Sequence, residues 1–295
     1  MAISDAPILV AGGDRDPNLA AIIAALAAAQ LPTRVVRFGA TARPWIAWDL
    51  DADTLIVDGE PCAPRAAFIR HDVFTQLADP RPQPGFRAAA WSIALQGFLL
   101  AHPDVRCFNH AGAAGPSNKP HLLTLARAEG LAIPRTLVTN HAPSARGFAP
   151  DGIAKPIGGG DVTRLLDDAV ALAKAPTVLA APALVQEQLV APELRVYVVG
   201  DRTFAFEVRS PRLDYRAGDD VEVVYVGDGP TPIARQVVAL AHRVGLDYAA
   251  ADLKSRPDGS LVFLELNTAP MFARFDQACD GALCRTMVAW LCAAR

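Results

Sequence analysis

Hydrophobic positions near the N-terminus alternate between strand-length and helix-length runs. A short apolar run at residues 8–11 ends at Gly12-Gly13, and a helix-length apolar segment covers residues 19–30. Pro32 ends that segment before a second strand-like run at residues 34–38. Strand, helix and strand within about 30 residues is typical of a βαβ unit and predicts a parallel sheet. Gly12-Gly13 also raises a dinucleotide-binding loop, but the G-x-G-x-x-G pattern is absent, so a turn is favoured.

A Pro-rich loop at residues 79–87 precedes a segment with helical spacing at residues 88–101. Trp91, Leu95, Phe98 and Leu99 share one face of this predicted helix, which favours core packing. A loop of small residues follows at 109–116, and we place the first domain boundary there.

A second predicted helix has clear start and stop signals. Asn118 or Ser117 can cap it, Pro120 is tolerated in its first turn, and Gly130 supplies a left-handed stop. Lys119 lies at its start, and a second lysine, Lys155, ends a predicted strand just before Gly158, Gly159 and Gly160. A lysine and bare backbone N–H groups can hold a phosphate, although such glycines more often only form loops.

Three strand-like runs follow, at residues 185–190, 192–199 and 204–209. Arg195 and Arg209 interrupt these apolar runs. An arginine in a strand is usually paired or faces water, whereas two of them with further charges can line a charged cleft.

The most informative stretch is residues 251–267, where Asp258-Gly259 separates two alternating runs. This pattern predicts a hairpin with a two-residue turn, in which Asp252 lies opposite Glu265 and Asn267 shares their face. Opposed carboxylates repel unless a cation lies between them, and oxygen ligands suit Mg²⁺. Two alternatives stay open: both acids could face solvent, or Pro257 could lengthen the turn and move Asp252 to the other face.

Composition narrows the class of protein. The chain has 295 residues, with 28 Lys and Arg against 31 Asp and Glu. The net charge of −3 argues against binding of nucleic acid. The longest apolar stretch, residues 19–31, falls short of the ~20 residues that span a bilayer, so we expect no membrane segment. The first residues lack a cationic signal region, and the five cysteines contain no C-x-x-C pair, so we expect reduced thiols and a cytoplasmic protein.

Several short motifs, in order along the chain, resemble those of the ATP-grasp superfamily of carboxylate–amine ligases. The likeness is greatest to the branch that modifies peptides and proteins, namely the ribosomal-protein glutamate ligases and the microviridin/marinostatin-type peptide ligases. The motifs that carry it are residues 109–113, Asn118-Lys119, 130–140, Lys155-Pro156, Gln186-Glu187, 194–196, Asp252-Leu253 and 265–267.

The resemblance implies a mixed α/β fold with a parallel α/β domain at residues 1–116. Two α+β subdomains, at residues 117–182 and 183–295, would grip ATP between them. It implies an ADP-forming ligase that activates a carboxylate as an acyl phosphate and joins it to an amine or hydroxyl. The expected cofactors are ATP and Mg²⁺, which Mn²⁺ could replace. The expected partners are a peptide, protein or small carboxylate substrate and a second copy of the chain in a homo-oligomer.

Site residues follow from the same resemblance. The residues that would bind ATP are Lys119, Lys155, the three glycines, the hinge at Gln186, Glu187, Gln188 and Leu189, and the ribose-binding acid Glu193. Asp252, Glu265 and Asn267 would hold the metal. Arg195, Arg209 and Arg216 would act in catalysis, and Asp214 would contact substrate. Independently of the resemblance, Arg70-His71-Asp72 ends a predicted strand, where Arg70 could contact substrate or the three residues could equally be a surface charge cluster.

The chain departs from the family pattern after Asn267, where residues 268–276 lack the expected Pro-x-Gly. That loop borders the acceptor site in the family, so the substrate stays open. Two other functions remain: a small-molecule amino-acid or dipeptide ligase of the same fold, and a non-catalytic ATP-binding module.

Overall fold

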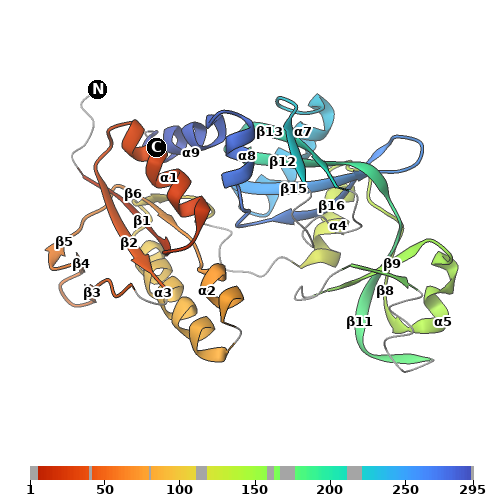
Figure 1. The fold of residues 1–295 in the computed structure, drawn as a ribbon, viewed down its shortest axis with the longest axis horizontal. Coiled ribbons are helices and arrows are strands. Elements are labelled where there is room, and N and C mark those ends of the chain that lie inside the picture. The colour runs from red at the N-terminus through yellow and green to blue at the C-terminus, as the bar shows by residue number, and fades with distance from the viewer. Residues whose placement is uncertain are drawn as a thin grey trace. The chain divides into compact units, whose positions relative to one another are not determined.

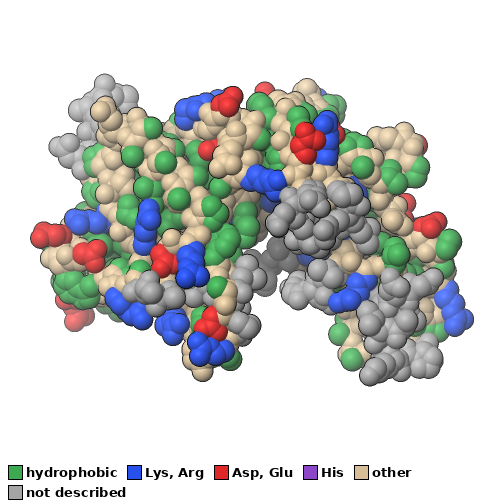
Figure 2. All heavy atoms as spheres, in the orientation of Figure 1, with side chains coloured by type: hydrophobic (Ala, Val, Ile, Leu, Met, Phe, Trp, Pro, Cys, Tyr) green, Lys and Arg blue, Asp and Glu red, His purple; other side chains and the backbone are tan. Residues whose placement is uncertain are grey.

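The computed structural model describes residues 6–39, 42–79, 81–110, 118–157, 163–166, 177–210 and 221–293. The chain divides into two compact units, Met1–Ala113 with Met271–Arg295, and Ala114–Pro270 (Figure 1). Among the described residues, no helix is long and apolar enough to cross a membrane. Basic and acidic side chains are interspersed over the face that Figure 2 shows, which agrees with the nearly balanced charge.

The first unit contains the predicted parallel sheet, in the strand order β2-β1-β6-β7. Its strands are β1 (Ile8–Gly13), β2 (Thr33–Phe38), β6 (Ala66–Ile69) and β7 (Arg106–Cys107). A small antiparallel sheet is formed by β3 (Ile46–Asp49), β4 (Thr54–Val57) and β5 (Glu60–Pro61). A side chain on Gly13 would collide with the Asp72 carboxylate, so this glycine permits a close approach, in line with the structural interpretation of Gly12-Gly13.

The helices of this unit are α1 (Pro17–Ala28), α2 (Val73–Ala78), α3 (Pro82–Ala101), α8 (Ala273–Ala278) and α9 (Ala282–Cys292). Helix α1 begins two residues before the predicted start, because Asp16 caps it by accepting from the Asn18 N–H. The core role predicted for the stripe on α3 is confirmed for Leu95, Phe98 and Leu99, which are buried.

The C-terminal residues pack in the first unit, whereas the sequence analysis assigned them to the domain 183–295. Asn18 Oδ1 accepts from the backbone N–H groups of Phe272 and Ala273. Arg106 donates to the Trp290 carbonyl at 2.6 Å and lies 3.9 Å from the centre of its ring. These contacts join positions far apart in sequence, which local patterns do not reveal. The five cysteines, all of which the structure describes, form no disulfide, as expected.

The second unit contains two antiparallel sheets. One has the order β10-β9-β11-β8 and is formed by β8 (Thr136–His141), β9 (Gly152–Pro156), β10 (Arg164–Leu165) and β11 (Val178–Glu187). The other has the order β14-β13-β12-β15-β16 and is formed by β12 (Val190–Val199), β13 (Arg202–Arg209), β14 (Glu222–Tyr225), β15 (Tyr248–Ser255) and β16 (Leu261–Asn267). The division of this unit into two subdomains stays a prediction.

Helices cover one face of the five-stranded sheet. They are α4 (Lys119–Ala128) and α7 (Thr231–Arg243), whose apolar residues pack on the sheet in one core (Figure 1). The short α5 (Ala142–Ala145) and the 3₁₀ turn η1 (Arg146–Phe148) pack beside the other sheet. Asn118 caps α4 by accepting from the His121 N–H at 3.0 Å, and Gly130 has φ +84°, so the predicted start and stop are confirmed. The opposite face of the five-stranded sheet carries the polar residues considered next.

Candidate active site

The hairpin β15–β16 has the predicted pairing although its turn is longer, so the open alternative of a turn lengthened by Pro257 is confirmed while the shift of Asp252 to the other face is wrong. Its loop has three residues rather than two, with Gly259 at φ +82°, and Ser255 therefore pairs with Leu261. A bulge at Leu264 then restores the register, so that Asp252 lies opposite Glu265 and Ala250 opposite Asn267. The longer loop alone would have separated the two acids. The bulge brings them back to one face.

Asp252 is nearly buried and accepts hydrogen bonds from Arg195 and Asn267. Arg195 Nη1 donates to its Oδ1 at 2.6 Å, and Asn267 Nδ2 donates to its Oδ2 at 3.0 Å. Burial raises the pKa of Asp252, the Arg195 charge opposes this rise, and the carboxylate of Glu265 adds to it. Two acids and an amide therefore converge on one face of the hairpin, as predicted.

Two lysines lie beside these acids. Lys119, at the start of α4, places Nζ 3.2 Å from Glu265 Oε2. Burial lowers the pKa of Lys155, and Glu265 opposes this while Lys119 and Lys254 add to it. A bound group with several negative charges would offset the mutual repulsion of these lysines.

Glu193 completes the charged cluster. It pairs across the strands with Lys254, whose Nζ lies 3.6 Å from Glu193 Oε2. Burial raises the pKa of Glu193 to about 7, the Asp252 carboxylate contributes to the rise, and Lys254 and Lys155 oppose it. A partly buried acid that titrates near neutrality beside lysines is typical of functional sites.

The segment 186–189 joins the two sheets of this unit. Gln186 is buried and donates Nε2 to Thr136 Oγ1 at 3.0 Å. The Glu187 N–H donates to the Arg135 carbonyl, and the Gln188 N–H donates to the Asp151 carbonyl. Leu189 is buried and follows the end of β11. Backbone hydrogen bonds thus hold the segment between the four-stranded and the five-stranded sheet, which is the position expected of the predicted hinge.

Comparison with known proteins was made along the whole chain. No protein-family model matches the sequence, and no curated protein matches it. Among solved structures, the ATP-grasp ligase PsnB complexed with minimal precursor is 27% identical, with a TM-score of 0.77 over 97% of this chain and 99% of that chain. PsnB complexed with minimal precursor, Mg and ADP is 26% identical, with a TM-score of 0.73 over 96% and 98%. The chain is thus similar in sequence and fold to ATP-grasp ligases over nearly its whole length.

A third structure agrees in fold. The macrocyclase MdnC bound with precursor peptide MdnA, from Microcystis aeruginosa MRC, is 20% identical, with a TM-score of 0.73 over 97% of this chain and 99% of that chain. The predicted fold class and the resemblance to the peptide-modifying branch of the superfamily are therefore confirmed. The roles of individual residues stay predictions, which the geometry supports unequally.

Arg209 is separated from the charged cluster. Arg195 pairs with Asp252 on one side and Phe206 on the other, so these three share a face. Arg209 is three residues after Phe206 and therefore points to the opposite face. Its guanidinium is 51% exposed and contacts Glu207 and Glu222. The alternation of β13 does not place Arg209 with the other candidate catalytic residues.

Of the other predicted site residues, only Arg70 lies within the part of the chain that the structure describes. Arg70 is buried in the first unit, where its Nε donates to Asp16 Oδ2 at 2.7 Å, so the alternative of a surface charge cluster is wrong for it. A substrate contact by Arg70 stays a prediction. The remaining candidates lie outside the described residues, namely Gly158, Gly159, Gly160, Asp214 and Arg216.

Three residues of this region were missed by the sequence analysis. Tyr197 accepts from Arg195 Nε at 3.0 Å, Lys254 faces Glu193, and Arg256 contacts Glu187. Lys254 and Arg256 follow Asp252 at intervals of two, so strand alternation could have placed them on its face. Tyr197 was hidden within an apolar strand.

The acids suit a magnesium ion by their chemistry. Two carboxylates and an amide are fewer protein ligands than an all-protein cage needs, and Mg²⁺ takes the rest from water and phosphate. Among the described residues, no group of three or more His, Cys, Asp or Glu is arranged to hold a metal. The Asn267 amide donates to Asp252, and half a turn of its side chain would present its oxygen instead.

Proposed function

We propose that this protein is an ATP-dependent ligase that activates a carboxylate as an acyl phosphate and joins it to an amine or hydroxyl of a peptide. One observation carries the proposal. Asp252, Glu265 and Asn267 converge on one sheet face, and Lys119 contacts Glu265 from α4. The comparisons support a peptide substrate, since PsnB and MdnC are described in complexes with precursor peptides.

The reaction has two displacements. A carboxylate oxygen attacks the γ-phosphorus of ATP, the bond to the β-phosphate oxygen breaks, and ADP leaves. An amine nitrogen or hydroxyl oxygen then attacks the acyl carbon, inorganic phosphate leaves, and the nucleophile loses its proton. The enzyme aligns the reactants and stabilises the charge that develops on the transferred group.

Named residues would divide this work. Asp252, Glu265 and Asn267 would hold Mg²⁺, which neutralises phosphate charge when bound. Lys119 and Lys155 would bind the phosphates, and Glu193 would accept hydrogen bonds from the ribose. Arg195 would keep Asp252 in place, since it already donates to that carboxylate. We also retain a cytoplasmic location and a homo-oligomer as predictions.

A product assay tests the proposal. ADP release and peptide mass would be measured with Mg²⁺ alone, with mixed amino acids, and with an acidic peptide encoded near the gene. The expected result is ADP release that depends on the peptide, with loss of one water from the peptide for each bond formed. Release with free amino acids only would favour a small-molecule ligase. Nucleotide binding without ADP formation under all three conditions would indicate a non-catalytic module.

A further inference from the structure

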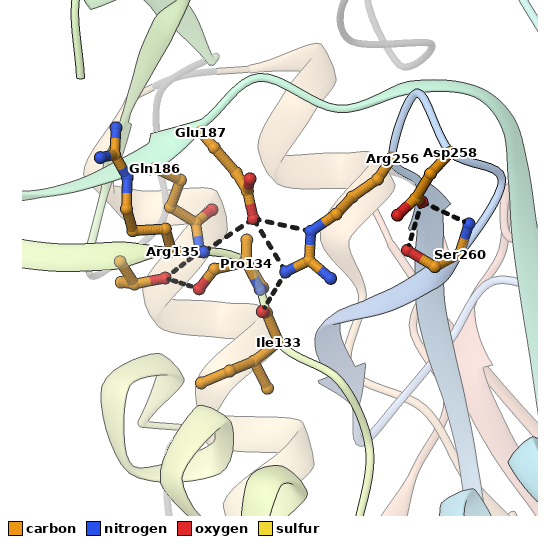
Figure 3. Close-up of polar contacts among 9 residues, drawn as sticks. Ile133, Pro134, Arg135, Gln186, Glu187, Arg256, Asp258 and Ser260 are labelled. Carbon is orange, nitrogen blue, oxygen red and sulfur yellow. Dashed lines mark hydrogen bonds and ion pairs between the residues drawn. The ribbon is translucent and has the colours of Figure 1, made fainter.

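An ion pair connects the β15–β16 hairpin, which carries the proposed metal ligands, to the end of β11. Arg256, in the loop between β15 and β16, donates Nε and Nη2 to Glu187 Oε1 at 3.2 and 3.0 Å (Figure 3). Arg256 Nη2 also donates to the Ile133 carbonyl at 2.9 Å. The connection between β15 and β16 is therefore attached to Glu187, the second residue of the predicted hinge.

The same carboxylate oxygen, Glu187 Oε1, also accepts a backbone hydrogen bond that a regular sheet would direct to a carbonyl. Glu187 donates its N–H to the Arg135 carbonyl, and in a regular antiparallel pair the Arg135 N–H would return to the Glu187 carbonyl. Here the Arg135 N–H donates to Glu187 Oε1 at 2.8 Å instead (Figure 3). The side chain thus replaces its own carbonyl as the acceptor.

The other neighbouring strand does not use this carbonyl either. The Gln188 N–H donates to the Asp151 carbonyl, which makes Gln188 and Asp151 the hydrogen-bonded pair. Because bonded and non-bonded pairs alternate, Glu187 and Gly152 form the non-bonded pair. Within the residues that the structure describes, the sheet register leaves the Glu187 carbonyl without a ladder donor on both sides.

We propose that Arg256 is a positioning residue for the nucleotide base. By holding the Glu187 carboxylate on the Arg135 N–H, it keeps the Glu187 carbonyl open to an exocyclic amino group. The site would thereby select a 6-aminopurine over a 6-oxopurine, which lacks that donor. This inference rests on the proposed function, because it requires the nucleotide to lie along residues 186–189.

If the Arg256–Glu187 ion pair served only to stabilise the fold, its loss would not affect the binding of ADP and IDP differently. The Arg256 and Glu187 side chains are 30% and 28% exposed, and ion pairs this accessible to solvent contribute little to stability. Loss of Arg256 should therefore leave the fold intact. It would release the Glu187 carboxylate and allow the Arg135 N–H to bond the Glu187 carbonyl, which would then compete with the base.

Calorimetry on the full chain tests this with ADP and IDP, each with Mg²⁺. Arg256→Gln should raise the Kd for ADP about tenfold, which is the value of one hydrogen bond, and should leave the Kd for IDP within about twofold. Arg256→Lys keeps the charge without the two-pronged geometry and should lie between Arg256→Gln and the unchanged protein. In kinetics, Arg256→Gln should raise the KM for ATP without lowering kcat.

Arg243→Gln is the matched control, because it removes an exposed ion pair with Glu129, 2.6 Å long, in the same unit. It should alter neither Kd. Equal weakening of ADP and IDP by Arg256→Gln, or no change in either, would overturn the role of Arg256. If the unchanged protein binds neither nucleotide, the nucleotide site itself fails, which is a separate result.

Discussion

Arg195 donates to Asp252 at 2.6 Å between neighbouring strands, and both side chains are nearly buried. The hydroxyl of Tyr197 accepts from Arg195 Nε at 3.0 Å, and the guanidinium also lies over the Tyr197 ring. The guanidinium is thus fixed by both residues. We infer that Tyr197 and Arg195 together fix the orientation of a carboxylate that is proposed to bind metal.

Tyr197→Phe should weaken the response to Mg²⁺ while leaving the fold intact. The substitution keeps the buried ring and removes only the hydroxyl, so Arg195 keeps its bond to Asp252 and loses the one to Tyr197. The expected change is a rise of about threefold to tenfold in the Mg²⁺ concentration for half-maximal ADP release, the worth of one hydrogen bond. Turnover at saturating Mg²⁺ should change less.

Tyr248→Phe is the control for this prediction. It removes a hydroxyl from another buried tyrosine of the same sheet, one that donates to the Pro270 carbonyl at 3.4 Å. An equal shift in both variants would show a general effect of hydroxyl loss and would contradict the positioning role.

Glu265→Gln and Lys155→Ala should nearly abolish ATP turnover. Each removes a charge placed for the transferring phosphate, and loss of one such contact typically costs about 3–4 kcal/mol, or a hundred- to a thousand-fold in rate. ADP release at saturating ATP and Mg²⁺ would measure this, with circular dichroism as the check on folding. Turnover like that of the unchanged protein in either variant would remove the proposed assignment.

The pH dependence of ATP binding should report Glu193. Its pKa lies near 7, so its carboxylate is protonated as the pH falls below 7 and becomes a weaker acceptor for the ribose. The KM for ATP should therefore rise toward low pH. Lys254→Met removes a positive charge that lowers this pKa, so the rise should begin at a higher pH.

Glu193→Gln separates this effect from other titrations. The amide does not ionise in this range, so the KM for ATP should be raised and nearly constant between pH 6 and 8. A pH profile in Glu193→Gln that still matches the unchanged protein would assign the titration to a different group.

The sequence predicted the pairing of Asp252 with Glu265 correctly although one step of the reasoning was wrong. Asp258-Gly259 indicated a two-residue turn, but Pro257 joins the loop. The error is cancelled by the bulge at Leu264, which no local pattern announces, because a bulge depends on the pairing of both strands. The pairing of Asp252 with Glu265 therefore depends on the loop length and the bulge together, and both are seen only in the folded sheet.

Long-range contacts set the limit of the sequence analysis elsewhere. The capping residues of α4 were predicted because a cap acts within a few residues. The return of residues 271–293 to the first unit depends on contacts across more than two hundred positions, such as that of Asn18 with Phe272. Arg256 likewise meets Glu187 across 69 positions.

Asn18→Ala should destabilise the first unit. Asn18 is 1% exposed, its Nδ2 donates to the helix-capping Asp16, and its Oδ1 accepts from the N–H groups of Phe272 and Ala273. Alanine would leave these two N–H groups without their acceptor, and each unsatisfied buried donor costs about 1–3 kcal/mol. We expect the free energy of unfolding in urea to fall by about 3 kcal/mol.

Asn140→Ala is the matched control, because Asn140 donates a single, longer bond to the Leu179 carbonyl at 3.3 Å and is only partly buried. It should cost about 1 kcal/mol or less. If Asn18→Ala cost no more than Asn140→Ala, the C-terminal helices would be held to the first unit mainly by apolar packing. The stacking of Phe108 on Trp290, with ring centres 4.3 Å apart, would then be the contact to test next.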